Sequence, residues 1–399
     1  MKNLLILTDA LPPAFAPRMG YLIGELCQQG YEVTAFATQY PQTHCHLPME
    51  RANVHILAYP STKNRLFSAL KSLLGCKNRW FYRAISNTIQ NQPFDAVLCS
   101  TYETFPLPTA LKIAQERNIP LIADLRDITE QFGSHYYKNR HPKAPWLGKW
   151  FANIKIKARN KVIKQANAVT SVSSWHVNYL KQYNPNVHLV YNGYDAKEFY
   201  FKPISSNKFS IVYTGRLVDE KLQDPTLFLQ ALEQLISTQQ IDKKNVAVHW
   251  YTDLASQKRL QGLVSPYTHV QAITQYHGLI PTQQIPAVLW ESSVALILTN
   301  QQTSDGPKGM MTTKFFEALG VEKPVLCVKS DEACLSHIIV QTNAGVAAKE
   351  VEKVKAFLLE KYAEWQKNGY THQVVNTVEK EKLSRAAMAK EFEKVCCQF

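Results

Sequence analysis

The 399-residue sequence has no apolar run long enough to cross a bilayer as a helix. It also lacks the long apolar core and the small-residue cleavage site that a signal peptide needs. Met1–Leu7 instead holds one lysine in a short apolar run, and Asp9 follows soon after. We interpret this start as a first β-strand and predict a cytoplasmic protein.

Cysteine pairs of the metal-binding or redox type are absent too. The eight cysteines form no C-x-x-C pair and no zinc-type spacing. Several lie in apolar runs of strand character, which is typical of free, buried thiols in a reducing compartment. We therefore expect free thiols and no bound metal.

Acidic residues are missing from two long segments of the first half. Residues 51–94 hold seven Lys+Arg and residues 131–194 hold ten, with no Asp or Glu in either segment. The net charge is +13, of which residues 1–194 carry +12 (22 Lys+Arg and 10 Asp+Glu). Such asymmetry indicates that the first half meets an anionic partner. Nucleic acid does not fit, because the basic residues accompany buried-type aromatics and no recognised nucleic-acid module is present.

The segment 146–162 combines these cations with aromatic residues at helical spacing. Residues 63–74 show a similar pattern. Basic amphipathic helices with Trp and Phe are typical of a contact with an anionic membrane surface. The alternative is an apolar stripe in the domain core beneath a solvated basic face. Because two such segments lie in the domain with nearly all the excess charge, we favour membrane contact through Trp146, Lys149, Trp150, Phe151 and Lys155.

Apolar runs and helical patterns alternate along the chain, which predicts an α/β fold. In the first half the expected strands are residues 4–8, 31–38, 96–100, 121–124 and 168–173, and the expected helices are 19–29 and 107–117. The pattern restarts after residue 200, with strands over 209–213, 246–251, 294–298 and 325–328 and a helix over 225–236. Near-continuous apolar strands are typical of a parallel sheet that helices cover on both faces.

The predicted fold is therefore two doubly wound, Rossmann-like domains facing a central cleft. The turn-rich segment 190–195 separates an amino-terminal domain over 1–194 from a second domain over 195–375. Residues 376–399 have helical composition, and we expect them to pack back on the first domain. In such folds ligands bind beyond the carboxyl ends of the strands, so we expect the site in the cleft.

Gly215 directly follows an expected strand, and two cations, Arg216 and Lys221, come soon after it. A glycine there lets the backbone approach a ligand. The two cations suit a diphosphate, above all one that leaves with extra negative charge. The alternative of a solvated loop with ordinary surface cations stays open.

A second candidate site is the segment 312–320, Thr-Thr-Lys-Phe-Phe-Glu-Ala-Leu-Gly. Thr312 or Thr313 can cap a helix whose free amino end binds phosphate. Glu317, one turn further, offers a carboxylate that can accept both hydroxyls of a ribose. A capping threonine and a solvated glutamate on a structural helix are the alternative.

Together these motifs resemble glycosyltransferase family 4, a large family of retaining enzymes with the GT-B fold. The resemblance covers nearly the whole chain, in order. Its motifs are Pro12-Pro13 with Gly20, Gly30-Tyr-Glu-Val33, Ala166–Ser173, Asn192-Gly-Tyr-Asp195, Gly215-Arg216 with Lys221, His277-Gly278, and Thr313-Lys-x-x-Glu317 with Lys323-Pro324. No single motif is decisive, but their order and spacing together are fairly specific.

The resemblance implies a donor site in the second domain. Arg216 and Lys221 would hold the diphosphate and stabilise the leaving group, and Glu317 would bind the ribose. Gly278 and its neighbours would face the base through backbone contacts. The implied donor-binding residues are Gly215, Arg216, Lys221, His277, Gly278, Thr312, Thr313, Lys314 and Glu317.

In the first domain, Asp124-Leu-Arg-Asp127 follows an expected strand and would face the cleft. Many family members carry a His-Asp pair there, with the histidine near the transferred sugar. Arg126 stands in the place of the histidine and Asp127 in that of the aspartate. The candidate catalytic residues are therefore Arg126, Asp127, Arg216 and Lys221. A structural ion pair in this loop is the alternative.

Two departures from the family pattern bear on function. Many relatives carry two glutamates separated by seven residues, and Gly309 stands at the first of these positions. The first loop lacks the usual paired glycines, and it holds Arg18. We therefore place Arg18 and Gly20 on the acceptor side, where Arg18 would reach an anionic group such as a phosphate.

The sequence thus predicts a retaining glycosyltransferase that moves a sugar from a nucleotide sugar to a lipid-linked or cell-envelope glycan acceptor. It would work on the inner face of the cytoplasmic membrane. The sequence has no Asp-x-Asp metal clamp, and cations with a helix end are available instead, so we expect no metal and no cofactor. A nucleotide-sugar epimerase and a catalytically inactive GT-B homologue that binds a nucleotide or a partner are the alternatives.

Overall fold

The structure is a computed structural model of the chain. It describes residues 2–12, 14, 16–40, 49–60, 67, 71, 74–90, 92–133, 144–217, 222–299, 306–331 and 333–399. The chain divides into two compact units, one formed by Met1–Tyr191 with Met388–Phe399 and the other by Asn192–Ala387.

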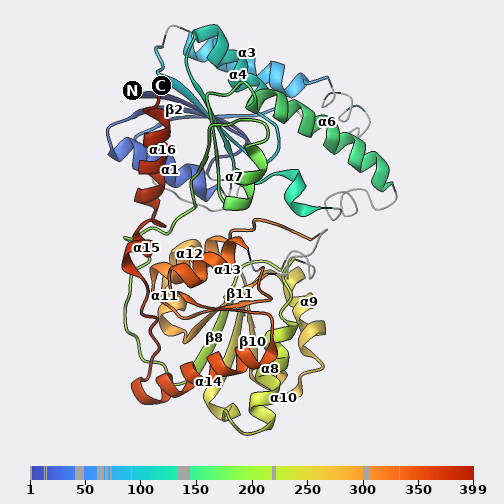
Figure 1. Ribbon diagram of the computed structural model, residues 1–399, viewed down its shortest axis with the longest axis vertical. Coiled ribbons are helices and arrows are strands. Elements are labelled where there is room, and N and C mark those ends of the chain that lie inside the picture. Colours follow the sequence, from blue (N-terminus) through green and yellow to red (C-terminus); the bar gives the residue numbers. More distant parts are fainter. Residues whose placement is uncertain are drawn as a thin grey trace. The chain divides into compact units, whose positions relative to one another are not determined.

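The first unit is built on a seven-stranded parallel sheet in the order β3-β2-β1-β4-β5-β6-β7 (Figure 1). Its strands are β1 (Asn3–Thr8), β2 (Glu32–Thr38), β3 (Asn53–Leu57), β4 (Ala96–Thr101), β5 (Leu121–Leu125), β6 (Ala168–Ser171) and β7 (Val187–Leu189). Its helices are α1 (Pro17–Gln28), α3 (Cys76–Ile89), α4 (Leu107–Arg117), α6 (Pro145–Ile163), α7 (Ser174–Leu180) and most of α16 (Arg385–Cys396), with the 3-10 turn η1 (Thr129–Phe132). The strand order reverses between β1 and β4, and doubly wound folds bind ligands at such a switch point.

Successive residues of β1 serve the two faces of this sheet. Leu5 and Leu7 pack with α3, α4, α6 and α7, whereas Leu4 and Ile6 pack with α1 and α16. All four side chains are fully buried. Helices on both faces of the sheet therefore explain why this strand is apolar throughout instead of alternating.

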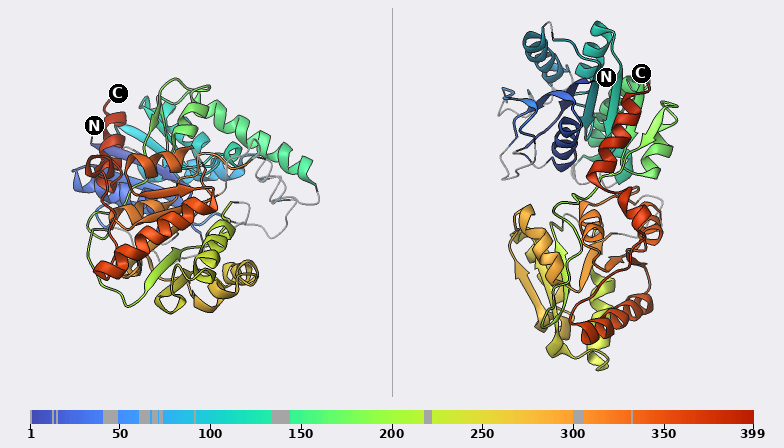
Figure 2. Two further views of the ribbon diagram at one scale, coloured as in Figure 1. Left: turned by 60° about the horizontal axis from the view of Figure 1, so that its bottom comes forward. Right: turned by 90° about the vertical axis from the view of Figure 1, so that its left-hand side faces the viewer.

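The last helix completes the core of the first unit. Met388, Phe392 and Val395 of α16 are buried in the cluster that α1 and the sheet also form. The Tyr31 hydroxyl donates a hydrogen bond to Glu393 at 3.1 Å. Figures 1 and 2 show α16 beside α1, although the two helices stand at opposite ends of the sequence.

The second unit is built on a six-stranded parallel sheet in the order β10-β9-β8-β11-β12-β13. Its strands are β8 (Phe209–Thr214), β9 (Val246–Tyr251), β10 (Thr274–His277), β11 (Val294–Leu298), β12 (Val325–Val328) and β13 (Gly345–Ala348). Its helices are α8 (Thr226–Ser237), α9 (Leu254–Val264), α10 (Thr268–Ile273), α11 (Ile285–Glu291), α12 (Thr313–Gly320), α13 (Cys334–Gln341), α14 (Val351–Asn368) and α15 (Thr377–Glu381), with the 3-10 turns η2 (Lys243–Asn245) and η3 (Thr282–Gln284). Here the order reverses between β8 and β11.

The predicted fold class is confirmed, because each unit is a doubly wound parallel sheet with helices on both faces. Four elements, α4, β9, β11 and β12, begin and end where the sequence places them. Within the described ranges, no helix is both long enough and apolar enough to cross a membrane.

Candidate active site

Three loops of the second unit leave its sheet at one edge. Thr214, Tyr251 and His277 are register partners across β8, β9 and β10, so these strands end level with one another. The Gly215 amide donates to the Tyr251 carbonyl at 2.8 Å, which continues the ladder beyond the strands. The loops that begin at Gly215 and Gly278 therefore start from the carboxyl edge, where doubly wound folds bind ligands.

Lys314, near the start of α12, lies against Gly215. A Cβ atom at Gly215 would lie 2.6 Å from Cε of Lys314, and the φ angle of Gly215 is +115°, so any other residue would be strained there. Burial lowers the pKa of Lys314, and the charge of Glu317 partly opposes this shift. An anion bound at the amine would favour its charged form.

Arg216 follows Gly215 and points a largely exposed side chain at the next loop. Its Nε lies 3.2 Å from Oδ2 of Asp253, and 65% of the side chain is exposed. Asp253 caps α9 by accepting the Ser256 amide at 2.8 Å. That backbone hydrogen bond is the main reason why the pKa of Asp253 is lowered. Lys221 lies outside the described residues, so the structure places only Arg216 of the expected cation pair.

The amino end of α12 has an extended residue, Thr312, at its N-cap. Among the described residues, no side-chain hydrogen bond caps this end, and Thr313 is the first helical residue. The Phe315 amide donates to the Thr312 carbonyl at 3.2 Å, which leaves the amides of Thr313 and Lys314 as those that could meet an anion. Glu317 lies one turn further, and burial raises its pKa while the charges of Lys314 and Arg385 act in the opposite direction.

The side chain of His277 is held by the neighbouring strand. Its Nε2 lies 3.0 Å from Nδ1 of His249, and its ring stacks on Tyr251 with the centroids 4.4 Å apart. Gly278, in contrast, is open: no described atom lies within 4 Å of the position that a Cβ would take. Gly278 is thus exposed at this edge, whereas the His277 ring is partly covered by its neighbours.

At the corresponding edge of the first unit, Asp124 is locked in a buried network. Arg18 holds it with two hydrogen bonds, Nε to Oδ2 at 3.1 Å and Nη2 to Oδ1 at 2.8 Å. The hydroxyls of Ser100 and Thr170 donate to the same carboxylate at 2.7 and 2.8 Å. Burial alone would raise the pKa of Asp124, but Arg18 and these hydroxyls hold it below its usual range.

This network contradicts the expectation that Arg18 reaches an anionic group of the acceptor. The residue is only 3% exposed, and its guanidinium is committed to Asp124, so Arg18 acts as a structural partner inside the unit. Gly20 lies buried within α1. Its place on the acceptor side stays a prediction.

Arg126 comes directly after β5, with its amide bonded to the Thr101 carbonyl at 3.2 Å. Its guanidinium forms an ion pair with Asp9, which follows β1. Within the described part of the chain, the buried Nε of Arg126 has no hydrogen-bond partner. Lys77 of α3 lies close by: its Nζ donates to Oγ1 of Thr38 at 3.3 Å, and that hydroxyl donates to the Asp9 carbonyl at 2.8 Å. These residues form a cluster of mixed charge at the switch point of the sheet.

Asp127 is fixed by a chain of neutral hydrogen-bonding groups. The Gln131 amide donates to Asp127 at 2.8 Å and accepts from the ring of His176, whose Nδ1 lies 2.6 Å from Oγ of Ser173. Burial lowers the pKa of His176 to about 4, so this ring is neutral at physiological pH. Burial also raises the pKa of Asp127. The network therefore orients Asp127 through neutral groups and places no charged residue of its own against the carboxylate.

In the described ranges, no group of three or more His, Cys, Asp and Glu side chains is arranged to hold a metal ion. The charged groups at both carboxyl edges are instead paired cations and carboxylates.

Residues 18–198 match the family model Glycosyltransferase Family 4. The match covers just under half of the chain. The resemblance inferred from the sequence is confirmed for this part of the chain, which is nearly the whole of the first unit. No curated protein matches the sequence.

Several solved structures resemble the chain over its full length. Sucrose-phosphate synthase from Thermosynechococcus elongatus has a TM-score of 0.66 at 13% identity, over 100% of this chain and 99% of that chain. Anabaena Alr3699/HepE in complex with UDP-glucose has 0.65 at 12% identity, over 100% of both chains. An E. coli structure bound with UDP-2-fluoro glucose has 0.63 at 10% identity, over 100% of this chain and 99% of that chain. At such identities the likeness shows the fold, which is GT-B. With the family match, it identifies the chain as a glycosyltransferase.

Gly309, which the resemblance pairs with a glutamate of many family members, lies outside the residues that match the family model. Its φ angle is +65°, in the left-handed region. A residue with a side chain costs roughly 1–2 kcal/mol there. The local backbone is therefore built around glycine, so a glutamate at this position would be strained.

Lys329 is a further cation at the carboxyl edge of the second unit's sheet, and the sequence reasoning missed it. It directly follows β12, and its amide donates to the Thr299 carbonyl at 3.1 Å. Its side chain forms an ion pair with Asp224, which also accepts the Thr226 amide at 2.8 Å at the start of α8. The sequence contains a signal that could have identified Lys329, namely a cation directly after a buried apolar strand. A similar signal selects Arg216 in the sequence.

The amphipathic segment forms helix α6, and several of the expected contact residues are exposed on it. Trp146 and Trp150 are 73% and 49% exposed, Lys149 lies between them on the exposed side, and Phe151 is half-buried. Lys155 forms an ion pair with Glu103 at 2.6 Å, and its place in the membrane contact stays a prediction. Most of the similar segment at 63–74 lies outside the described residues.

Proposed function

We propose that this glycosyltransferase moves a sugar from a nucleotide sugar to a lipid-linked or cell-envelope glycan acceptor, with retention and without a metal. The observation that carries the proposal is the side chain of Lys314, which lies against Gly215 at the carboxyl end of β8. A cation held at the switch point of a doubly wound sheet is well placed for the phosphates of a nucleotide.

In this proposal the donor is a nucleotide sugar. Structures similar to the chain support this choice of donor. Anabaena Alr3699/HepE, one of them, has been solved with UDP, with UDP and glucose, and with UDP-glucose. Lys314, Arg216 and the amino end of α12 would contact the diphosphate. Negative charge grows on that group as the bond to the sugar breaks, and the cations stabilise it. This supplies the electrostatic role that a metal ion plays elsewhere.

The acceptor side would be the cluster formed by Asp9, Arg126 and Lys77 in the first unit. Arg126 is proposed to lie near the transferred sugar, with Asp127 held in orientation by Gln131. The acceptor oxygen bonds to the anomeric carbon as the bond to the diphosphate oxygen breaks. The departing phosphate accepts the acceptor proton on the same face, so the configuration is retained without a protein nucleophile.

We propose that α6 docks the enzyme on the inner face of the cytoplasmic membrane. Trp146 and Trp150 are exposed one turn apart, and Lys149, Lys157 and Lys161 are exposed on the same helix. Exposed tryptophans insert at the level of lipid headgroups while neighbouring lysines meet anionic lipid. A lipid-linked acceptor would then lie near the surface where the enzyme binds.

The reaction is tested by incubating the protein with nucleotide sugars and extracted membrane lipids in the presence of EDTA. We expect release of the nucleoside diphosphate and formation of a glycosylated lipid or glycan. The nuclear magnetic resonance spectrum of that product should show the same anomeric configuration as the donor. An inverted linkage would refute retention, and loss of turnover in EDTA would refute metal independence.

The membrane contact is tested with the double variant Trp146→Ala/Trp150→Ala. Each tryptophan loses its insertion into the interface, so we expect binding to anionic vesicles at low salt to fall at least about tenfold. Leu254→Ala/Val340→Ala is the matched control, because those two side chains are 75% and 73% exposed in the second unit. Equal flotation of both variants and the wild type would refute the docking face.

A further inference from the structure

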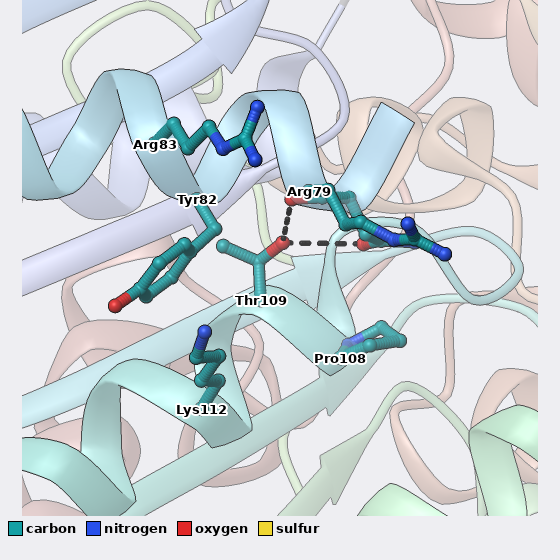
Figure 3. A pocket seen from close by; sticks show the side chains of 7 residues that line it. Arg79, Tyr82, Arg83, Pro108, Thr109 and Lys112 are labelled. Carbon is teal, nitrogen blue, oxygen red and sulfur yellow. Dashed lines mark hydrogen bonds between the residues drawn. The ribbon is translucent and has the colours of Figure 1, made fainter. Parts of the chain in front are cut away.

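A pocket of about 300 Å³ opens between α3 and α4 of the first unit. Figure 3 shows Arg79, Tyr82 and Arg83 reaching it from α3 and Lys112 reaching it from α4. Thr109 lies at its base. No residue of this pocket belongs to either carboxyl edge described above, so the proposed transfer reaction makes no use of it.

The floor of the pocket is fixed by hydrogen bonds. The buried hydroxyl of Thr109 donates to the Asn78 carbonyl at 3.0 Å and lies 3.2 Å from Oδ1 of the same residue. Arg79 is anchored at the rim, where its Nη2 donates to the Leu74 carbonyl at 2.9 Å. The two helices are thereby held in register around the opening.

The lining carries side-chain charge of one sign only, on exposed residues. It contains three cations, Arg79, Arg83 and Lys112, and no acidic residue. Glu116 is the carboxylate that adjoins it, since it accepts the Tyr82 hydroxyl at 2.8 Å and lies 3.7 Å from Lys112. Three positive charges against one negative charge leave a net charge of +2 at the pocket. A pair of arginines and a lysine is a donor set that matches a phosphate group.

We propose that this pocket binds the phosphate group of an anionic membrane lipid. The lipid is favoured over a soluble phosphate because α4 packs between α3 and α6, so the pocket lies in the helical layer that carries the exposed tryptophans. The inference rests on the proposed membrane contact of α6. It gives that contact a specific headgroup site in place of a diffuse attraction.

The experiment compares three probes on the full-length protein. Vesicles of phosphatidylcholine with phosphatidic acid present a phosphate, vesicles with oleate at the same surface charge present a carboxylate, and sn-glycerol 3-phosphate is the soluble phosphate. We expect the wild type to prefer phosphatidic acid over oleate. Arg79→Ala/Arg83→Ala should bind phosphatidic acid vesicles roughly 25-fold more weakly, because each lost cation contributes a factor of about five.

The matched control is Arg51→Ala/Lys181→Ala, which removes two exposed cations of the first unit outside the pocket. It should keep the preference for phosphatidic acid. Lys112→Gln, an exposed position, is a second pocket variant with an expected loss of roughly fivefold. An equal loss in pocket and control variants would overturn the proposal.

Two further outcomes are informative. The first identifies the source of the phosphate, and the second separates failure of the lipid site from failure of the donor site. If glycerol 3-phosphate binds the wild type but vesicle binding is unchanged in the pocket variants, the lipid assignment is wrong. The melting shift caused by a donor nucleotide should be the same in wild-type and pocket variants, since the pocket lies outside the donor edge. Absence of that shift in every protein would refute the proposed donor site and leave the vesicle result standing.

Discussion

Lys314→Ala is expected to lower the turnover of the nucleotide sugar by about 10²–10³-fold, the usual effect of removing one preorganised electrostatic group from an active site. The amine lies at the end of β8, where Gly215 makes room for it. It is already partly desolvated, so an interaction with a departing diphosphate would be stronger there than in water. Turnover is measured as release of the nucleoside diphosphate at saturating donor.

Lys244→Ala is the matched control for this experiment. Lys244 is exposed in η2, which directly precedes β9 and therefore lies at the amino edge of the same sheet. The two variants change the net charge of the second unit equally, and only the first removes a cation from the carboxyl edge. If both retain wild-type turnover while remaining folded, Lys314 does not contact the diphosphate.

Arg18→Met is expected to destabilise the first unit by about 3–5 kcal/mol, because it leaves the buried carboxylate of Asp124 without its cation. Ser100 and Thr170 would still donate to that carboxylate. Two hydroxyls do not replace a bidentate guanidinium in a site with 0% exposure. Hydrogen exchange at the amides of β1 and β5 measures the loss within the first unit.

The double variant Arg18→Met/Asp124→Asn is the control for this experiment. It removes both charges, so most of the lost protection should return. If Arg18 is purely structural, this variant also keeps the wild-type KM for the acceptor. Unchanged exchange in Arg18→Met would show that the ion pair contributes nothing, and a raised acceptor KM in the double variant would restore the acceptor role to Arg18.

The same pair sets a pH dependence. The folded state holds the pKa of Asp124 below its usual value, so the contribution of this group is present above about pH 4, the pKa of an unperturbed aspartate. That contribution is lost as the pH falls through the lower, folded pKa. Arg18→Met removes the main cause of the depression, so its stability should fall less steeply than that of the wild type on acidification.

The sequence predicts the central strands best. Strands β11 and β12 are buried throughout and read as uninterrupted apolar runs, which have few other interpretations. Strands β3 and β10, in contrast, lie at sheet edges and keep half-exposed residues. Their patterns are too short and too mixed to separate from loops, so the sequence reasoning missed them.

The candidate site was predictable only in part. Gly215, Arg216 and Glu317 could be predicted from local patterns. The first two come directly after an expected strand, and Glu317 lies one turn into an expected helix. The contact between Lys314 and Gly215 depends on the spatial order β8-β11, which joins segments about a hundred residues apart and leaves no local trace. The commitment of Arg18 to Asp124 is equally non-local. Helical spacing predicted the helix α6 itself, because that pattern is local in the sequence.

The most direct test of the central claim, a nucleotide-sugar site at the carboxyl edge of the second unit, is thermal melting with a panel of UDP, GDP, ADP and CMP and their common sugars. A nucleotide at 100 times its dissociation constant should stabilise the protein by roughly 2.7 kcal/mol, which a melting curve resolves. The account predicts a clear shift with one nucleotide and its loss in Lys314→Ala. A panel without any shift would contradict the account.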